Sequence, residues 1–181
     1  MTMEKLRAEM TAFFQKLYID QQKVLVFGEG PLHARLMLIG EAPGEQESLQ
    51  GRPFVGKAGR NLDEFLALSG LNRSELYITN TVKYRPVRQS AAGNTVNRAP
   101  TQEEIRLGLP FLKREIALVA PEVIVTLGNV PLRALMGRQA TIGALHGQWQ
   151  TWEERRLYPL YHPASVIYNR ALKSVYEEDV V

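Results

Sequence analysis

The chain has 181 residues, of which 45% are hydrophobic and 23% charged, and this length and composition fit one globular domain over residues 1–181. It has no cysteine, which excludes disulfides, thiolate catalysis and cysteine-ligated metal centres. The net charge of +3 favours a polyanionic partner only weakly.

The first predicted element is an amphipathic helix over residues 3–18, where apolar side chains recur at helical spacing. Two further helices are predicted over residues 58–69 and 101–119. The second of these begins with Thr101 and Glu104 at the spacing of a capping box, in which each residue satisfies a free backbone amide of the other.

Short apolar segments bounded by Gly, Asn or Pro predict buried strands, and a last helix is predicted from about Pro163. Continuous apolar strands that alternate with helices are typical of a parallel sheet covered by helices on both faces. We therefore expect a three-layer α/β/α fold around a central, mostly parallel sheet of four to five strands. The predicted strands cover residues 24–27, 35–40, 76–79, 123–128 and 156–161.

Residues 84–100 form a long polar stretch without periodicity, which predicts a surface loop. Loops of this length inside a domain are often functional or mobile. This loop carries Arg85, Arg88 and Arg98, and the alternative is a solvated insertion whose arginines have no function.

Polar residues follow four of the predicted strands: Glu41, Asn80, Asn129 and His162. Ligands of open parallel sheets bind beyond the carboxyl ends of the strands, so these residues are expected to lie near one another. Each residue alone has an ordinary structural explanation. Together they predict a site that accepts a planar polar ligand and offers a carboxylate and a neutral hydrogen-bond donor.

Two glycine-rich segments, residues 28–31 and 40–44, superficially resemble phosphate-binding loops. Neither contains GxGxxG at the start of a helix or GxxxxGK[ST], and Pro43 removes an amide that such a loop would use. Nucleotide hydrolysis or dinucleotide binding is therefore a minor alternative.

Seven motifs follow one another in the chain: FGEG (27–30), GEAPGEQE (40–47), GRPFVGKAG (51–59), YITNTVK (77–83), NRAP (97–100), APEVIVTLG (120–128) and YHPAS (161–165). In this order the sequence resembles the uracil-DNA glycosylase superfamily, most closely its family 4. The resemblance implies a DNA-repair enzyme that flips uracil out of DNA, hydrolyses its N-glycosidic bond and leaves an abasic site without a lyase step. The implied partners are uracil-containing DNA and free uracil.

The resemblance also implies how uracil is held. Phe54 is similar to the residue on which the flipped base stacks. The amide of Asn80 suits uracil because it pairs with O4 and N3–H and mismatches cytosine at both positions. The backbone around Gly40 and Glu41 would complete the contacts.

Bond cleavage leaves cationic character on the sugar and negative charge on uracil. By similarity, Glu41 would position water or stabilise the sugar cation. His162, expected to be neutral, would donate a hydrogen bond to uracil O2. Glu47 is an alternative carboxylate that would crowd the C5 methyl group of thymine, and the division of labour between the two glutamates stays open.

Basic and small residues near the motifs would contact phosphates, which carry much of the salt-dependent affinity of such proteins. Ser165 lies where the last predicted helix begins and would offer a further donor. The expected DNA-binding residues are Arg52, Lys57, Lys83, Arg85, Arg98 and Ser165.

Members of family 4 generally hold a [4Fe–4S] cluster through four cysteines, and this sequence departs from that pattern. Alignment on FGEG and NRAP puts Phe13, Lys16, Tyr84 and Gly108 at the four positions. None of these residues is a ligand of an iron–sulfur cluster, so we expect no cofactor. Apolar packing through residues such as Phe13 and Tyr84 is expected to hold the first helix instead.

Residues 87–96 lengthen a connection that is shorter in typical family 4 sequences. A related branch traps the sugar through a histidine in this region, but this segment has none. Two hypotheses remain: an active glycosylase without a metal, or a binding module that recognises uracil or damaged DNA and cuts slowly or not at all.

No apolar run approaches the roughly 20 residues of a membrane helix. The N-terminal residues carry charges where a signal peptide would be apolar. We therefore expect a cytoplasmic monomer with no membrane contact.

Overall fold

The central sheet is built from β1 (Leu36–Gly40), β2 (Tyr77–Asn80), β5 (Val123–Leu127), β6 (Gln150–Trp152) and β7 (Arg155–Leu160). The computed structural model describes residues 1–181 and gives the strand order β2-β1-β5-β7-β6. All pairs are parallel except β6 with β7, which is an antiparallel pair at one edge. The mostly parallel sheet predicted from the sequence is thereby confirmed.

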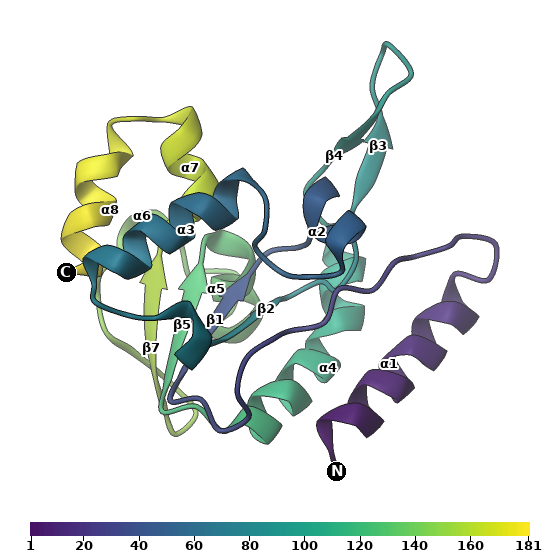
Figure 1. Cartoon of the computed structure of the whole chain (residues 1–181), viewed down its shortest axis with the longest axis horizontal. Helices are drawn as coiled ribbons and strands as arrows, with labels where there is room; N and C mark the ends of the chain where they lie inside the picture. The colour runs from purple at the N-terminus through teal and green to yellow at the C-terminus, as the bar shows by residue number, and fades with distance from the viewer.

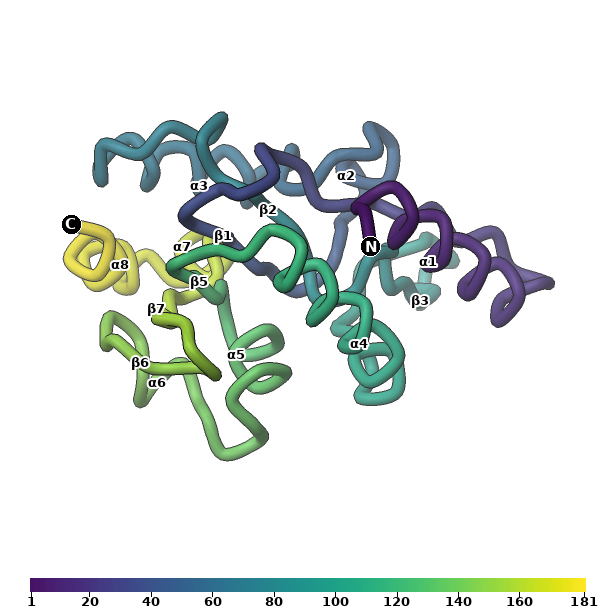
Figure 2. The backbone as a smooth tube through the Cα atoms, turned by 90° about the horizontal axis from the view of Figure 1, so that it is seen from below, coloured from purple at the N-terminus to yellow at the C-terminus, as the bar shows by residue number.

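Helices cover both faces of the sheet and complete three layers (Figures 1 and 2). The first core lies under α1 (Met3–Leu17), α4 (Gln102–Val119) and α5 (Asn129–Met136). The second lies under α3 (Lys57–Leu68), α7 (Pro163–Tyr168) and α8 (Leu172–Val180).

The alternation of side chains along β1 explains why its sequence is apolar throughout. Met37 and Ile39 enter the first core, and Leu38 enters the second. Successive strand residues point to opposite faces, so a strand with helices on both sides needs apolar residues at every position. Burial of each such side chain contributes about 1.5–3 kcal/mol.

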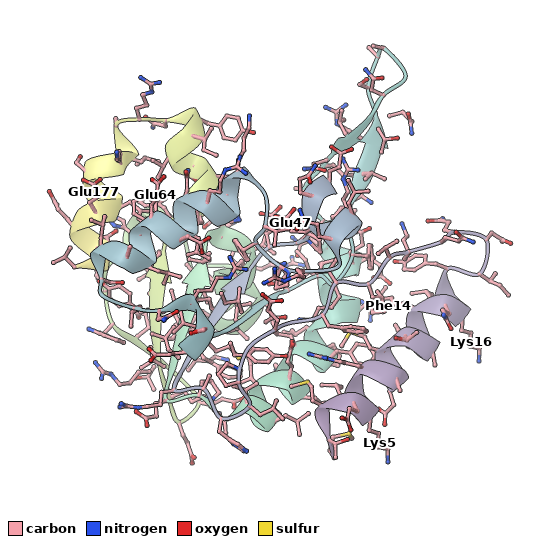
Figure 3. All side chains as sticks on the ribbon, in the orientation of Figure 1. Lys5, Phe14, Lys16, Glu47, Glu64 and Glu177 are labelled. Carbon is pink, nitrogen blue, oxygen red and sulfur yellow. The ribbon has the colours of Figure 1, made fainter.

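An aromatic cluster fixes α1 to the rest of the molecule, and its members are Phe14, Tyr18, Tyr84 and Phe111. Phe14 is buried and contacts Tyr84 and Phe111 at ring centroid distances of 5.5 and 5.8 Å. It faces α4 in Figure 3, whereas Lys5 and Lys16 point away. The Tyr18 and Tyr84 hydroxyls share a 2.8 Å hydrogen bond. Apolar attachment of α1 is therefore confirmed, with Phe14 rather than the more exposed Phe13 as its buried member.

The start of α4 is the predicted capping box. Thr101 Oγ1 accepts from the Glu104 amide at 3.1 Å, and Glu104 Oε2 accepts from the Thr101 amide at 2.8 Å. Short elements escaped prediction because they are too short to show periodicity, and these are α2 (Glu45–Gln50), α5, α6 (Ile142–Leu145), β6 and a 3₁₀ turn at Arg73–Glu75.

The strand predicted over residues 24–27 is wrong. This segment runs beside β2 but makes only scattered bonds, including 2.6 Å from the Val26 amide to the Lys83 carbonyl. A single bridge joins Glu29 to Ile78. Gly30, at φ +132°, then turns the chain away, and glycine is needed there because a Cβ would lie 2.1 Å from the Leu76 carbonyl oxygen.

The loop predicted over residues 84–100 contains a hairpin of β3 (Val87–Gln89) and β4 (Thr95–Asn97), which projects from the body of the molecule (Figure 1). Its turn is closed by a 2.8 Å bond from the Ser90 amide to the Asn94 carbonyl. The strands are too short for a recognisable alternation, and the Gly93–Asn94 turn was the only signal.

The terminal helix predicted from Pro163 is interrupted and forms α7 and α8. Asn169 ends α7, and its side chain accepts from the Ala171 amide at 3.1 Å, a local bond that competes with the helix. None of the helices is both long and apolar enough to span a membrane.

Candidate active site

A cavity of about 390 Å³ opens where β1 and β2 end, a size within the ~300–1,000 Å³ range of small-molecule pockets. It brings together Glu47 on α2, Phe54 before α3, Asn80 at the end of β2 and His162 at the start of α7. Four predicted site residues from distant motifs therefore meet at one place. Gly40 and Glu41 directly precede Ala42, which lines the cavity, but they are not part of the lining themselves.

Asn80 presents an unpaired acceptor to the cavity. Its side chain is only 3% exposed, and its Oδ1 has no hydrogen-bond partner in the chain. A buried acceptor without a donor costs about 1–3 kcal/mol, so this atom indicates a ligand with an N–H group. Gly40 is paired with Asn80 across the sheet, and a Cβ there would lie 2.5 Å from Oδ1. Glycine is therefore required for the amide to occupy its place.

Phe54 forms an aromatic wall in a constrained backbone. Its φ of +50° is unusual for a residue with a side chain, and strain of this kind is often retained at functional sites. Arg73 holds the segment by donating to the Pro53 and Phe54 carbonyls at 2.6 and 2.7 Å. Gly59 allows α3 to approach, since a Cβ there would lie 2.0 Å from the Phe54 carbonyl oxygen.

Glu47 organises the cavity wall through its carboxylate. Its oxygens accept from the amides of Gly44, Val55 and Gly56 at 3.1, 3.2 and 3.0 Å. It thereby ties α2 to the segment that leads into α3, and Figure 3 shows it between these elements. Both oxygens accept from backbone amides, so Glu47 lines the cavity and also holds the cavity wall in position.

His162 is held as a neutral donor. Its Nδ1 accepts from the Ala164 amide at 3.1 Å, so Nδ1 carries no proton and Nε2 carries the N–H. Burial lowers the pKa of His162 to about 4, although the nearby Glu47 carboxylate opposes this. The neutral imidazole predicted from the sequence agrees with this geometry. The ring lies 6.0 Å from that of Phe54, between centroids.

Glu41 follows directly after β1. Burial raises the pKa of its carboxyl group above the ordinary value of 4.5. Its carbonyl accepts from the Val82 amide at 3.0 Å, which fixes the chain where β1 and β2 both end. The Glu41 side chain makes no hydrogen bond to the protein, which leaves it available to a substrate or to water.

The prediction that Lys83 contacts DNA is wrong. Its side chain is 1% exposed, and its three N–H groups all donate within the protein. The acceptors are Thr79 Oγ1 at 2.5 Å, the Asn80 carbonyl at 2.6 Å and Glu115 Oε2 at 2.5 Å. The sequence around Lys83 did not show this burial, because its partner Glu115 lies on α4, distant in the chain.

The other predicted DNA-binding residues differ in how free they are. Lys57 is exposed and lines the cavity, and Ser165 is half-buried on α7. Arg52 is exposed but pairs with both oxygens of Glu29. Arg85 donates to Asn97 at 2.6 Å, and Arg98 donates to both oxygens of Glu104. Both arginines therefore brace the hairpin, whereas Lys57 is exposed at the cavity.

Four residues at or behind this site were not predicted from the sequence. Asn97 brings the hairpin into the cavity lining. Tyr168, 89% exposed, stands at the cavity rim together with Ile167. Arg73 acts through Phe54. An exposed aromatic residue at the end of a helix is a recognisable signal, but the contacts of Asn97 and Arg73 depend on folding and have none.

The four positions aligned with cluster cysteines do not fit an iron–sulfur cluster. Tyr84 lies within the aromatic cluster, Phe13 packs edge-on against Phe14, and Lys16 is exposed. A Cβ at Gly108 would lie 2.8 Å from the Thr81 carbonyl oxygen, so a longer side chain has no room there. The chain has no cysteine to ligate a cluster, and no group of three or more His, Asp or Glu is placed to hold a metal.

A mostly parallel sheet has a cavity beyond its strand ends, where an amide, an imidazole and an aromatic ring meet, and this arrangement defines an α/β protein whose cavity suits a planar polar ligand. The model of the Uracil DNA glycosylase superfamily matches residues 27–180, and the chain belongs to this superfamily.

Two curated relatives and one solved structure illustrate this membership. The chain is 38% identical to the type-4 uracil-DNA glycosylase of Saccharolobus solfataricus, over 87% of this chain and 74% of the relative. It is also 38% identical to the type-4 uracil-DNA glycosylase of Thermotoga maritima, over 91% of this chain and 83% of the relative. The crystal structure of Pedobacter heparinus SMUG2 shares the fold, with a TM-score of 0.56 and 15% identity, over 97% of this chain and 80% of that one.

Proposed function

We propose that this chain is a monofunctional uracil-DNA glycosylase that flips uracil out of DNA, hydrolyses its N-glycosidic bond and leaves an abasic site. The observation that carries the proposal is the buried, unpaired Oδ1 of Asn80. Uracil N3–H would satisfy this acceptor, and the amide NH₂ would donate to uracil O4. Cytosine would present an acceptor at N3 and a donor at N4, so both contacts would be mismatched.

The remaining site residues suit the charges that develop as the bond breaks. The neutral His162 would donate from Nε2 to uracil O2 while negative charge accumulates on the base. The free carboxylate of Glu41 would stabilise the sugar cation or orient the attacking water. Phe54 would stack on the base, and the Gly40 backbone would line its edge. Glu47 would preserve the wall that holds these groups in place.

The cavity rim offers what a flipped nucleotide requires from its surroundings. Lys57 would contact a phosphate next to the target, with Ser165 as a further donor and Arg52 available if it leaves Glu29. The exposed Tyr168 and Ile167 would fill the gap left in the base stack, because apolar side chains commonly wedge between base steps. Arg85 and Arg98 would support DNA binding through the hairpin that they brace.

We also propose that the reaction needs no cofactor and that the protein acts as a cytoplasmic monomer. The missing sulfur ligands and the aromatic packing of α1 support the first part. Light scattering of the purified protein would test the second, and a mass near 40 kDa instead of the monomer's 20.4 kDa would contradict it.

The experiment is incubation of the protein with an oligonucleotide that contains a single uracil, followed by alkali. Cleavage at the uracil position, absent with thymine or cytosine in its place, is the expected result. Activity should persist in EDTA, since no step uses a metal. Intact strands at stoichiometric protein, together with tight uracil-dependent binding, would instead identify a binding module.

A further inference from the structure

Lys83 and Glu115 form a buried ion pair directly behind the base-binding residue. Their side chains are 1% and 3% exposed, and Lys83 Nζ lies 2.5 Å from Glu115 Oε2. Glu115 also accepts from Tyr77 Oη at 2.8 Å and from Thr79 Oγ1 at 3.1 Å. The pair lies beneath the sheet in the core shared by β2 and α4, so it cannot reach DNA.

Within the pair, Lys83 contacts the backbone of Asn80. Strand β2 ends at Asn80, so the carbonyl of this residue has no ladder partner further along the sheet. Lys83 turns back over three residues and donates to that carbonyl at 2.6 Å. Thr81, the next residue, donates from its amide and its hydroxyl to the Gly40 carbonyl at 2.9 and 2.8 Å. Two anchors thus enclose the peptide that carries the Asn80 side chain.

Replacement of a buried ion pair by apolar residues is often neutral or stabilising, so stability alone gives little reason for this pair. Desolvation also opposes the charge, since burial lowers the pKa of Lys83 and only the Glu115 carboxylate counters it. A fixed amide, in contrast, has a clear use. An amide that rotates would present its NH₂ group where Oδ1 belongs and would accept cytosine.

We propose that Lys83 and Glu115 are positioning residues, which lock the Asn80 backbone so that its amide meets the base in one orientation. The inference rests on the proposed function, because it assigns Asn80 the reading of uracil. Lys83 supplies the bond to Asn80, and Glu115 holds the ammonium group in place.

The test is the double variant Lys83→Met/Glu115→Gln. It removes the donor to the Asn80 carbonyl, while the Gln amide keeps an acceptor for Tyr77 and leaves no buried charge. Tyr77→Phe is the matched control, since it removes a bond to Glu115 but keeps that from Lys83 to Asn80. We expect the double variant to lose about 10- to 100-fold in single-turnover rate on uracil DNA, the effect of a small misplacement of a reacting group. Its affinity for DNA should stay within about threefold, and Tyr77→Phe should stay within about twofold in rate.

A second readout does not depend on activity. The side-chain ¹⁵NH₂ signal of Asn80, identified by its loss in Asn80→Ala, should be sharp in the parent protein and in Tyr77→Phe and exchange-broadened in the double variant. If the parent does not cut uracil DNA, the proposed function fails, but this signal still tests the positioning. A folded double variant with parental rate and a parental Asn80 signal would overturn the inference. Should it not fold, Lys83→Met/Glu115→Met takes its place in both measurements.

Discussion

Asn80 in the cavity and Tyr84 in the aromatic cluster under α1 are only four residues apart in the chain, yet the two regions obey different constraints. Asn80 leaves a buried acceptor unpaired, at a cost to stability. Tyr84 is buried too, but its hydroxyl is satisfied by Tyr18. In the cavity the chemistry of the ligand dictates the residue. In the cluster only volume and satisfied polar groups matter.

This contrast predicts that substitutions in the cluster reduce stability and leave the reaction intact. Phe14→Ala should lower the free energy of unfolding by about 3–5 kcal/mol, because it leaves a cavity between α1 and α4. Urea unfolding measures the loss, and the rate per folded molecule should not change. Phe13→Ala, at a 39% exposed position of the same helix, is the control and should cost much less. Equal losses in the two variants would show that the cluster does not anchor α1.

The converse is expected in the cavity. Asn80→Ala should lower the excision rate by about 10²–10³-fold, the effect of removing one donor from a transition-state site. The melting temperature should stay the same or rise, since an unpaired buried acceptor is removed. Asn94→Ala, at the exposed hairpin tip, should change neither quantity. A variant that loses stability in proportion to activity would show that Asn80 serves the fold and not the base.

His162 joins the two kinds of constraint, because its burial keeps the imidazole neutral for the proposed reaction and also affects stability. Burial lowers its pKa to about 4, against 6.5 in the unfolded chain. As pH falls from 6.5, the unfolded chain binds the proton first, so stability decreases until about pH 4. The two pKa values correspond to a loss of about 3 kcal/mol.

Urea unfolding at several pH values checks this loss, with His162→Gln as a control that should show a flatter profile. The raised pKa of Glu41 acts in the opposite direction, because its folded form gains the proton first. The hydrogen bonds from Arg98 and from the Thr101 amide lower the pKa of Glu104 to about 2. Glu104 therefore affects stability only below about pH 4.5. A parent profile as flat as that of His162→Gln would contradict the burial of a neutral imidazole.

Elements that depend on a repeating pattern or on neighbouring residues could be predicted from the sequence. Contacts between residues that are distant in the chain could not. The apolar runs of β1 and β5, the period of α3 and the capping box of α4 each follow from neighbouring residues, so they were predicted correctly. The predicted sites of Asn80 and His162 came from strand ends that a parallel sheet aligns. Lys83 was misassigned because its charge pointed to phosphate, while Glu115, 32 residues away, determines its burial. The β3–β4 hairpin was missed because its strands are three residues long.

The smallest expected effect concerns Lys57, which stands at the first position of α3. A cation there opposes the helix dipole, so Lys57→Ala should stabilise the fold slightly, by about 0.3 kcal/mol or more. If the lysine is placed for a phosphate, the same change should weaken DNA binding several-fold and reduce the slope of log affinity against log salt by about 1. Fluorescence anisotropy at several salt concentrations measures both. Lys16→Ala, an equal change of charge on the far side of α1, is the control. A decrease common to both variants would reflect only net charge, whereas a loss confined to Lys57→Ala would place DNA across the cavity mouth at the start of α3.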